Sequence, residues 1–561
     1  MLSSMRRMAR MSGVSAWLGA SGGIALLIVA PLVALGAAAV GGSSALWTDL
    51  FAYVLPGAVR DTLTLLVGVG LVSAAIGTVT AWLVSAYDFP GRRVADWALL
   101  LPLAVPTYIV AYAYLDLLHP VGPVQTALRA LLGIDNPRDL RLPDIRSMGG
   151  CIVLLGCVLY PYVYLTTRAM FLMQSANLME VARTLGVGRR RLFVRVALPL
   201  ARPAMVVGVT LVLLETLNDI GASEFLGIRT LTVSIYSTWI TRSDLPGAAQ
   251  MALALIVIVL GLVVWERRAR RQRRYANDAQ HPRPLTPHRL RGARAAAALV
   301  ICTLPVLVGF VLPAAYLVDE SITRIAFAGV SAAVYRETLN TVTLSLAATT
   351  ITLAAGVIVA YTARVGRGPW PAIFARIAAL GYAVPGTVLA IGLLPVVTGV
   401  EAAADAIAQW LFGISLGLFL LGSGAAAVYA YAVRFLALAT GGAETGFSRV
   451  SPSLDEAART MGEGPAGRLW RIHLPLARPA LATAALLVFV DCMKELPATL
   501  LLRPLGVETL ATHLYGEAVR GTYEEAAIAA LLIVAAGLVP VVALARLSRP
   551  HRLEVDAESW L

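Results

Sequence analysis

The sequence predicts an all-α polytopic membrane protein, with about 12 transmembrane helices in two parallel six-helix repeats. Three observations support this fold class. Of the 561 residues, 58% are hydrophobic and only 14% are charged, whereas a soluble protein carries about 25% charged residues. Apolar runs close to the roughly 20 residues that cross a bilayer recur along the chain, without the short alternating pattern of a membrane barrel. Segments of the first half also reappear in the second half.

The apolar runs predict the helices in order. The first six are expected near residues 17–40, 62–86, 96–118, 148–172, 201–221 and 247–265, and the second six near 295–318, 340–363, 373–398, 414–438, 477–497 and 525–546. The basic start of the chain resembles a signal peptide, but the apolar stretch from Ala16 to Val40 is long for one, so we expect an uncleaved first helix. The four cysteines lie in apolar segments, which predicts buried hydrophobic residues rather than disulfides or metal ligands.

The distribution of arginine predicts the orientation in the membrane, because positively charged loops favour the cytoplasmic side. If the basic N-terminus is cytoplasmic, the loops after the even-numbered helices also lie inside. Those loops carry Arg92, Arg93, Arg189, Arg190, Arg191, Arg195, Arg364 and Arg367. One loop fits less well, because the external loop after the third helix has four arginines, which three aspartates partly offset. We therefore expect both termini in the cytoplasm of a bacterium with the chain in its inner membrane, and the net charge of +13 reflects lipid-bilayer orientation rather than nucleic-acid binding.

The two halves are expected to be joined by a cytoplasmic linker. Residues 267–294 are rich in arginine and contain three prolines, which predicts a solvated segment with little fixed structure that could contact anionic lipid headgroups. The expected organisation is an N-terminal helix and external loop (1–60), a first repeated domain (61–266), the linker (267–294), a seventh helix and external loop (295–339), a second repeated domain (340–546) and a cytoplasmic tail (547–561).

The halves match over several segments. The stretch "DTLTLLVGVGLVSAAIGTVTAWLV" from Asp61 parallels "NTVTLSLAATTITLAAGVIVAYTA" from Asn340, and "LPLAVPTYIVAYAYL" from Leu101 parallels "LGYAVPGTVLAIGLL" from Leu380. An even number of helices in each half makes the repeats parallel, related by an axis along the membrane normal. A pathway between two such halves is the expected place for a substrate.

The clearest repeat is a charged loop. The stretches 180–204 and 456–480 are identical at 14 of 25 positions. Both have Glu, then Ala two residues later, Gly four residues after that, and a Leu-Pro pair: Glu180, Ala182, Gly186, Leu198 and Pro199, matched by Glu456, Ala458, Gly462, Leu474 and Pro475. The pattern predicts a short helix that the glycine ends, followed by a turn at Leu-Pro into the next membrane helix. A solvated positive-inside loop explains the arginines but not the matched spacing, which indicates a surface that docks a partner.

Both loops resemble the EAA motif of ABC-importer permeases with the type I fold, and the resemblance covers nearly the whole chain as two fused permease domains. In that family the loop is a coupling helix that docks on a separate ATPase subunit, so the resemblance implies two copies of an ABC ATPase and a soluble substrate-binding protein as partners. The chain has one lysine, Lys494, and it lacks the glycines of a phosphate-binding P-loop. ATP is therefore expected on the partner subunit, with no cofactor bound by this chain and no enzyme activity of its own.

Charged residues inside the membrane are the candidates for the translocation path. Glu215 lies roughly 20 Å along the fifth helix, with Asn218 beside it and Asp219 one turn further on the same face. The matching residues of the eleventh helix are Asp491, Lys494 and Glu495. One interpretation is four carboxylates around a passage near its external mouth, which would favour a cation. The alternatives are a structural network in which Lys494 neutralises a carboxylate, or simple placement at helix ends; a tight metal site is not expected, because conduction needs weak binding.

The residues around these charges predict the substrate less firmly. "DCMKELPATLLLRPLGVETLATHLY" and "LNDIGASEFLGIRTLTVSIYSTW" resemble the fused permeases of iron(III) importers. Thiamine, polyamine and phosphonate permeases share much of this architecture, and Asp61 stands where the second half has Asn340. Two other classes remain as hypotheses: a proton-coupled secondary transporter, which the paired loops argue against, and a scaffold that only binds an ATPase.

Overall fold

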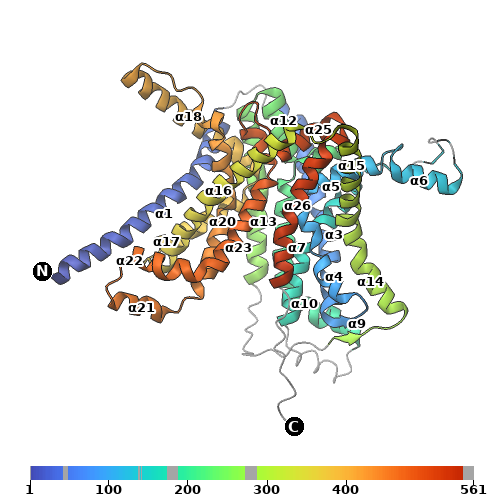
Figure 1. Ribbon diagram of the computed structural model, residues 1–561, viewed down its shortest axis with the longest axis horizontal. Helices are drawn as coiled ribbons and strands as arrows, with labels where there is room; N and C mark the ends of the chain where they lie inside the picture. The colour runs from blue at the N-terminus through green and yellow to red at the C-terminus, as the bar shows by residue number, and fades with distance from the viewer. Residues whose placement is uncertain are drawn as a thin grey trace, which may run out of the picture.

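The computed structural model describes residues 2–41, 48–134, 136, 139–140, 142–173, 188–271 and 287–547. These residues form a bundle of helices, in which the strands that are described are two residues long (Figure 1). Eleven of the described helices are long and apolar enough to cross a membrane, or up to twelve if a bent pair is counted as one span. The predicted fold class is therefore confirmed.

The elements follow one another in two similar series. The first half contains α1 (Leu2–Val40), a π-helical turn η1 (Leu50–Val54), α3 (Leu55–Ala86), β1 (Tyr87–Asp88), α4 (Arg92–Ala98), η2 (Leu101–Ala104), α5 (Thr107–Leu117), α6 (Pro123–Leu132), α7 (Met148–Met173), α9 (Arg189–Leu192), η3 (Phe193–Ala197), α10 (Leu198–Asn218), α11 (Gly221–Phe225), α12 (Leu231–Arg242) and α13 (Leu245–Arg271). The second half contains β2 (His288–Arg289), α14 (Ala293–Val306), η4 (Leu307–Val311), α15 (Leu312–Ala328), α16 (Ala332–Val365), α17 (Trp370–Ala383), α18 (Gly386–Phe412), α19 (Phe419–Ser423), α20 (Ala425–Ser448), α21 (Pro452–Thr460), α22 (Pro465–Arg468), η5 (Leu469–His473), α23 (Leu474–Met493), α24 (Pro497–Leu502), α25 (Leu510–Arg520) and α26 (Tyr523–Leu547).

Two helices that the sequence predicts as continuous are broken at matched Val-Pro pairs. The predicted helix 96–118 bends by 91° between η2 and α5, and the predicted helix 373–398 separates into α17 and α18. Val105 and Val384 both have extended backbones, with ψ of 118° and 122°. The residue before a proline is forced out of the helical region, so each valine ends one helix and the following proline caps the next. These breaks place short segments of non-helical backbone at the centre of the bundle.

The fifth and eleventh membrane helices also end earlier than predicted. α10 ends at Asn218, and Asp219 is extended, with φ −72° and ψ 121°. α23 ends at Met493, so Lys494 and Glu495 lie in the turn that leads to α24. The prediction that Asp219 continues one face of the fifth helix is therefore wrong. The chain leaves the helix there, because its carboxylate caps the next short helix.

The predicted helix 414–438 is wrong at its start. α18 continues to Phe412, and the chain then passes through Gly413, Gly417 and Gly424, which have positive φ angles of 68°, 61° and 81°. Glycine adopts this left-handed conformation without steric cost. The membrane helix α20 therefore begins only at Ala425 and extends ten residues beyond the predicted end.

Part of the predicted linker is ordered. α13 continues through residue 271, and β2 pairs in parallel with β1, with Tyr87 opposite His288 and Asp88 opposite Arg289. The prediction of little fixed structure is therefore wrong for both ends of 267–294, while 272–286 lie outside the described residues. The pairing fixes the start of the second half against the loop after α3.

The first membrane helix of each half packs against the other half. α1 contacts α16, α17 and α18 as well as α13, and α14 with α15 contacts α3, α4, α5 and α7 as well as α26. In Figure 1, α1 accordingly runs beside α16 and α17, and α14 lies beside α4. The two halves are therefore interlocked rather than separate domains.

Within each half, a glycine allows two helices to approach closely. A Cβ on Gly77 of α3 would lie 2.7 Å from the Cβ of Val163, and one on Gly356 of α16 would lie 2.7 Å from the Cβ of Ala439. These equivalent contacts align Val163 with Ala439, which sets the register between α7 and α20. The coupling-loop element α21 lies with α9 at one end of the bundle, and α12 and α25 lie at the other (Figure 1).

Candidate translocation site and coupling helix

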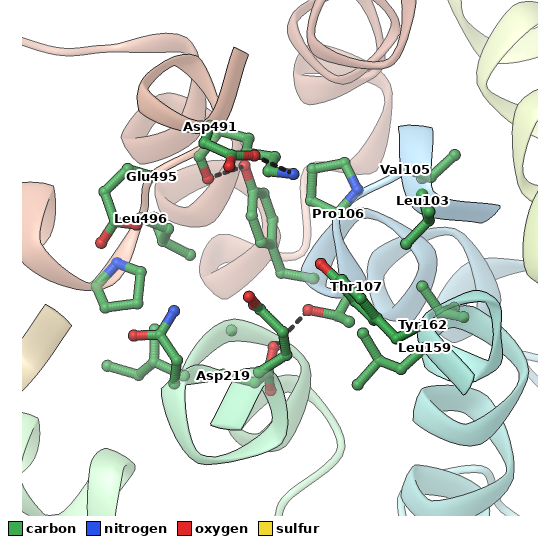
Figure 2. A pocket seen from close by; sticks show the side chains of 18 of the residues that line it. Leu103, Val105, Pro106, Thr107, Leu159, Tyr162, Asp219, Asp491, Glu495 and Leu496 are labelled. Atoms are coloured by element: carbon green, nitrogen blue, oxygen red, sulfur yellow. Dashed lines mark hydrogen bonds and ion pairs between the residues drawn. The ribbon is translucent and has the colours of Figure 1, made fainter. Parts of the chain in front are cut away.

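A cavity of about 90 Å³ lies where the helix breaks of the two halves meet. It is lined at one side by Pro106 and Thr107, which follow the break in the third helix, and at the other by the ends of α10 and α23 (Figure 2). All six residues predicted for the translocation path line it: Glu215, Asn218, Asp219, Asp491, Lys494 and Glu495. The matched spacing in the two halves therefore identified six side chains that lie around one cavity. Their role in transport stays a prediction.

Asp219 is held by its own half. Its Oδ1 accepts a hydrogen bond from the Thr107 hydroxyl at 2.7 Å, and its Oδ2 accepts from the backbone N–H and the hydroxyl of Ser223 at 2.8 and 3.0 Å. The Thr107 contact is drawn in Figure 2. A carboxylate at this position satisfies backbone donors at the start of the short helix α11. This requirement explains why the chain leaves α10 immediately before Asp219.

Glu495 occupies the equivalent position in the second half. Its Oε1 accepts from the backbone N–H of Ala498 at 3.1 Å and from Nη1 of Arg434 at 2.9 Å. Both side chains are buried, with exposed fractions of 3% and 8%. Arg434 is not among the residues that the sequence predicts for the site. A signal was present, because a single arginine inside an apolar helix is expensive and normally has a buried partner.

Several contacts cross between the halves at this level. Nη1 of Arg434 also donates to Oδ1 of Asn218 at 2.7 Å, and the Tyr382 hydroxyl donates to Oε1 of Glu215 at 2.9 Å. The Tyr108 hydroxyl donates to the backbone oxygen of Lys494 at 3.2 Å. The two tyrosines were also missed, because aromatic residues are common in apolar helices and carry no distinct pattern. Together these bonds close the space between the halves.

The charges of the cavity are unequal between the halves. Four carboxylates and two basic side chains line it, a formal surplus of two negative charges. Both basic residues belong to the second half, where Lys494 Nζ lies 2.7 Å from Asp491 Oδ1 and Arg434 pairs with Glu495. Within the described residues, Glu215 and Asp219 form no ion pair. By the register of the glycine contacts, Val158 takes the place of Arg434 in the first half, and both line the cavity.

No group of three or more His, Cys, Asp and Glu side chains is arranged to hold a metal ion within the part of the chain that the structure describes. The carboxylates that line the cavity carry oxygen atoms, the ligand type that hard cations prefer.

The second coupling loop is a helix, a turn and a helix. α21 carries Glu456 on its exposed face and Ala458 on its buried face, and Gly462 follows with φ +87°. The predicted end of this helix at a glycine is thus observed. The predicted turn at Leu-Pro is not, because η5 leads without interruption into α23, where Leu474 and Pro475 are the first residues. The π-helical turn accommodates the proline, which lacks an N–H.

The first coupling loop is only partly visible. Glu180, Ala182 and Gly186 lie outside the described residues. Leu198 and Pro199 begin α10 directly after the π-helical turn η3, in the same arrangement as their counterparts in the second half.

A network of charged residues holds α21 against the membrane helices. The Asp455 carboxylate accepts from Nε and Nη2 of Arg364 at 3.1 and 2.9 Å, and it lies 2.8 Å from Nε2 of His473. Nη1 of Arg468 is 3.5 Å away. Arg364 also donates to the backbone oxygens of Phe447 and Val450 at 2.6 and 2.8 Å, so one side chain joins α16, α20 and α21.

The first half has an aromatic cluster at the corresponding level. Trp82 of α3 packs against Phe171 and Phe193, each with ring centres 5.2 Å apart. In the second half, Tyr361 takes the position of Trp82 in the glycine-based alignment, and its hydroxyl donates to the backbone oxygen of Pro465 at 2.6 Å. The two coupling regions are therefore similar in shape and different in chemistry.

Two parallel helical repeats around a charged cavity define a membrane transport protein. The chain belongs to the family of binding-protein-dependent transport system inner membrane components, whose model matches residues 73–274 and 352–553. It is a permease component of an ABC importer and a multi-pass protein of the inner membrane.

Curated relatives differ in what they carry. The Fe(3+)-transport system permease protein FbpB 2 of Haemophilus influenzae is 23% identical over 484 residues, which cover 86% of this chain and 88% of the relative. The molybdenum transport system permease protein ModB of Escherichia coli is 30% identical over 36% of this chain and 89% of its own length. A putative 2-aminoethylphosphonate permease, PhnU of Salmonella paratyphi A, is 30% identical over 33% of this chain and 65% of its own length.

Proposed function

We propose that this chain is the permease of a ferric iron importer, which receives iron from a soluble binding protein and is driven by two copies of a separate ABC ATPase. The resemblance to the Fe(3+) permease FbpB 2, which extends over both halves, supports iron. The observation that carries the proposal is the formal surplus of two negative charges in the cavity between the halves. A trivalent cation is attracted by this surplus, and hard cations prefer oxygen ligands.

The same surplus argues against the anionic substrates of other relatives. Molybdate and phosphonates would have to pass Glu215 and Asp219, which form no ion pair within the described residues. The basic groups that such anions need are already engaged, because Lys494 pairs with Asp491 and Arg434 pairs with Glu495. An oxyanion permease would be expected to offer unpaired donors instead.

The size of the cavity is compatible with a hydrated ion. A water molecule needs about 10–15 Å³ of such volume, so about 90 Å³ accommodates an ion with several waters.

In this proposal the coupling loops transmit the work of the ATPase. The exposed face of α21, with Glu456, and the matching loop with Glu180, Ala182 and Gly186 would each dock one ATPase copy on the cytoplasmic side, where both termini also lie. ATP is bound by the partner subunits. Closure of the ATPase dimer would move α21 and, through Arg364 and Asp455, the ends of α16 and α20.

Transport of ⁵⁵Fe(III) into proteoliposomes, with the purified binding protein outside and the ATPase and ATP inside, tests the proposal. We expect uptake of iron and not of molybdate. In Glu215→Gln we expect iron uptake to fall about tenfold, which corresponds to about 1.4 kcal/mol. The matched control is Glu444→Gln, which removes an exposed carboxylate on α20 away from the cavity. Uptake of molybdate in place of iron would overturn the substrate, and uptake that continues without the ATPase would favour a secondary transporter.

A further inference from the structure

Arg434 occupies a position that joins the two halves. A single nitrogen, Nη1, donates to Asn218 of the first half at 2.7 Å and to Glu495 of the second half at 2.9 Å. The backbone N–H of Gly386 donates to the same oxygen of Asn218 at 2.8 Å. The guanidinium therefore lies across the space that a substrate must use, at the point where the two repeats meet.

The position requires a glycine in the opposing helix. A Cβ on Gly386 would lie 2.5 Å from Nη1 of Arg434 and 2.7 Å from Oε1 of Glu495. Gly386 is the first residue of α18, immediately after the Val-Pro break. The break thus provides the room in which the arginine bridges the halves.

The guanidinium is incompletely satisfied. Its Nε is buried and has no hydrogen-bond partner within the described residues. A buried donor without a partner is energetically unfavourable. Arg364 offers a contrast within the same chain, because its Nε, Nη1 and Nη2 all donate hydrogen bonds. The hydrogen bonds of Arg364 use all of its nitrogen atoms, whereas those of Arg434 to Asn218 and Glu495 both use Nη1.

The arrangement exists in one half only. Val158 stands at the equivalent position of α7, so no second arginine balances Arg434 across the axis. A residue that merely neutralised a buried carboxylate would be expected for both halves, since both have one at this place. The asymmetry indicates a function that requires a single cation at the centre.

We propose that Arg434 is a tethered counter-cation that closes the passage and is displaced by the metal cation that the permease carries. In the empty protein its guanidinium lies on Glu495 and bridges to Asn218, which holds the halves together. A metal cation that enters the cavity competes with the guanidinium for the carboxylate of Glu495. The two cations also repel each other when both lie next to this carboxylate, because the dielectric constant there is low. When the guanidinium leaves, the bond to Asn218 is lost, so metal binding and separation of the halves become one event.

This inference rests on the proposed function, and Arg434→Gln tests it in the complex with ATPase and binding protein. The probe is ⁵⁵Fe(III) supplied as the nitrilotriacetate complex. We expect the variant permease to retain iron about tenfold more tightly than the wild type, because the competing charge is gone. We also expect ATP hydrolysis without the binding protein to rise several-fold, because the halves are no longer bridged. Arg324→Gln, which breaks an ion pair with Glu525 outside the cavity, is the control and should change neither quantity.

Iron retention by Arg434→Gln that is equal to or weaker than that of the wild type would overturn the inference. If Arg434→Gln does not fold, Asn218→Ala removes the bridge and keeps the ion pair. It should raise hydrolysis without the binding protein, and unchanged hydrolysis would then overturn the inference. Failure of the proposed function is recognised separately, because in that case the wild type takes up no iron.

Discussion

At the scale of single residues, Asp455 shows how one carboxylate can position an element. Burial alone would raise the pKa of Asp455, but hydrogen bonds from His473 and Arg364 hold it below its ordinary value. A carboxyl group whose pKa is lowered by folding stabilises the protein above its ordinary pKa, and this contribution is lost as the pH falls through the lowered value. At neutral pH the contribution is fully present and does not vary.

We therefore expect Asp455→Asn to lower the free energy of unfolding by about 1–3 kcal/mol at neutral pH, because Arg364 and Arg468 lose the charge between them. Thermal unfolding of the detergent-purified chain measures the effect. Asp455→Glu should restore part of the stability, and Arg520→Gln, which affects an exposed ion pair with Glu517, should have little effect. An unchanged melting temperature in Asp455→Asn would show that the network contributes nothing.

The candidate site was predictable where one residue type recurs at matched spacing. Glu215 with Asp219, and Asp491 with Glu495, could be identified because each pair follows a long apolar segment and the same spacing occurs in both halves. Arg434 could not be assigned in this way, because Val158 replaces it in the other half and its partner Asn218 is more than 200 residues away. Contacts between halves depend on tertiary packing, which a repeat pattern does not encode.

At the scale of elements, α21 depends on the conformation of one residue. Gly462 has φ +87°, and no atom lies within 4 Å of the position that a Cβ would take. A side chain there would be strained by the backbone itself and not by a neighbour. The helix ends at this point because glycine alone adopts the left-handed conformation without steric cost.

We expect Gly462→Ala to distort the end of α21 at a cost of about 1–2 kcal/mol and to weaken ATPase binding several-fold. Gly462→Asn should be less damaging, because asparagine tolerates a positive φ. Gly464→Ala is the matched control in the same turn, since Gly464 has φ −73° and also has open space around it. The measurement is the affinity of the purified ATPase for the permease in nanodiscs. Equal affinities for the Gly462 and Gly464 variants would contradict the argument.

The elements themselves were predicted with mixed success for identifiable reasons. Apolar length located the membrane helices, because a bilayer demands about 20 apolar residues whatever their packing. The breaks at Val105 and Val384 were missed, because an apolar Val-Pro pair is equally compatible with a kinked but continuous helix. The ends of α10 and α23 were missed because helix boundaries at Asp219 and Lys494 depend on capping contacts rather than on hydrophobicity.

At the scale of the whole molecule, duplication of the sequence did not produce two independent domains. A sequence repeat is compatible with halves that fold separately and are joined by a simple tether. The structure shows a different arrangement, because α1 packs against α16, α17 and α18, and α14 packs against α3, α4 and α7. Each half therefore completes the surface of the other, and the interface includes the contacts of Arg434 and Tyr382 at the centre.

This interlocking predicts how the chain responds to being cut. A break in the linker between residues 271 and 287 removes no contact between α1 and the second half, so the two fragments should assemble when they are produced together and should transport substrate comparably to the intact chain. Either fragment alone should fail to form a stable protein, because it leaves the apolar face that receives α1 or α14 exposed. Size-exclusion chromatography in detergent and transport in proteoliposomes measure both outcomes.

The control is a break between Gly227 and Arg229, which separates α10 from α12. These two helices are joined by a hydrogen bond of 2.5 Å from the Thr232 hydroxyl to the backbone oxygen of Leu217. A second half that purified alone as a stable protein would show that the crossed helices are dispensable and that the halves are domains after all.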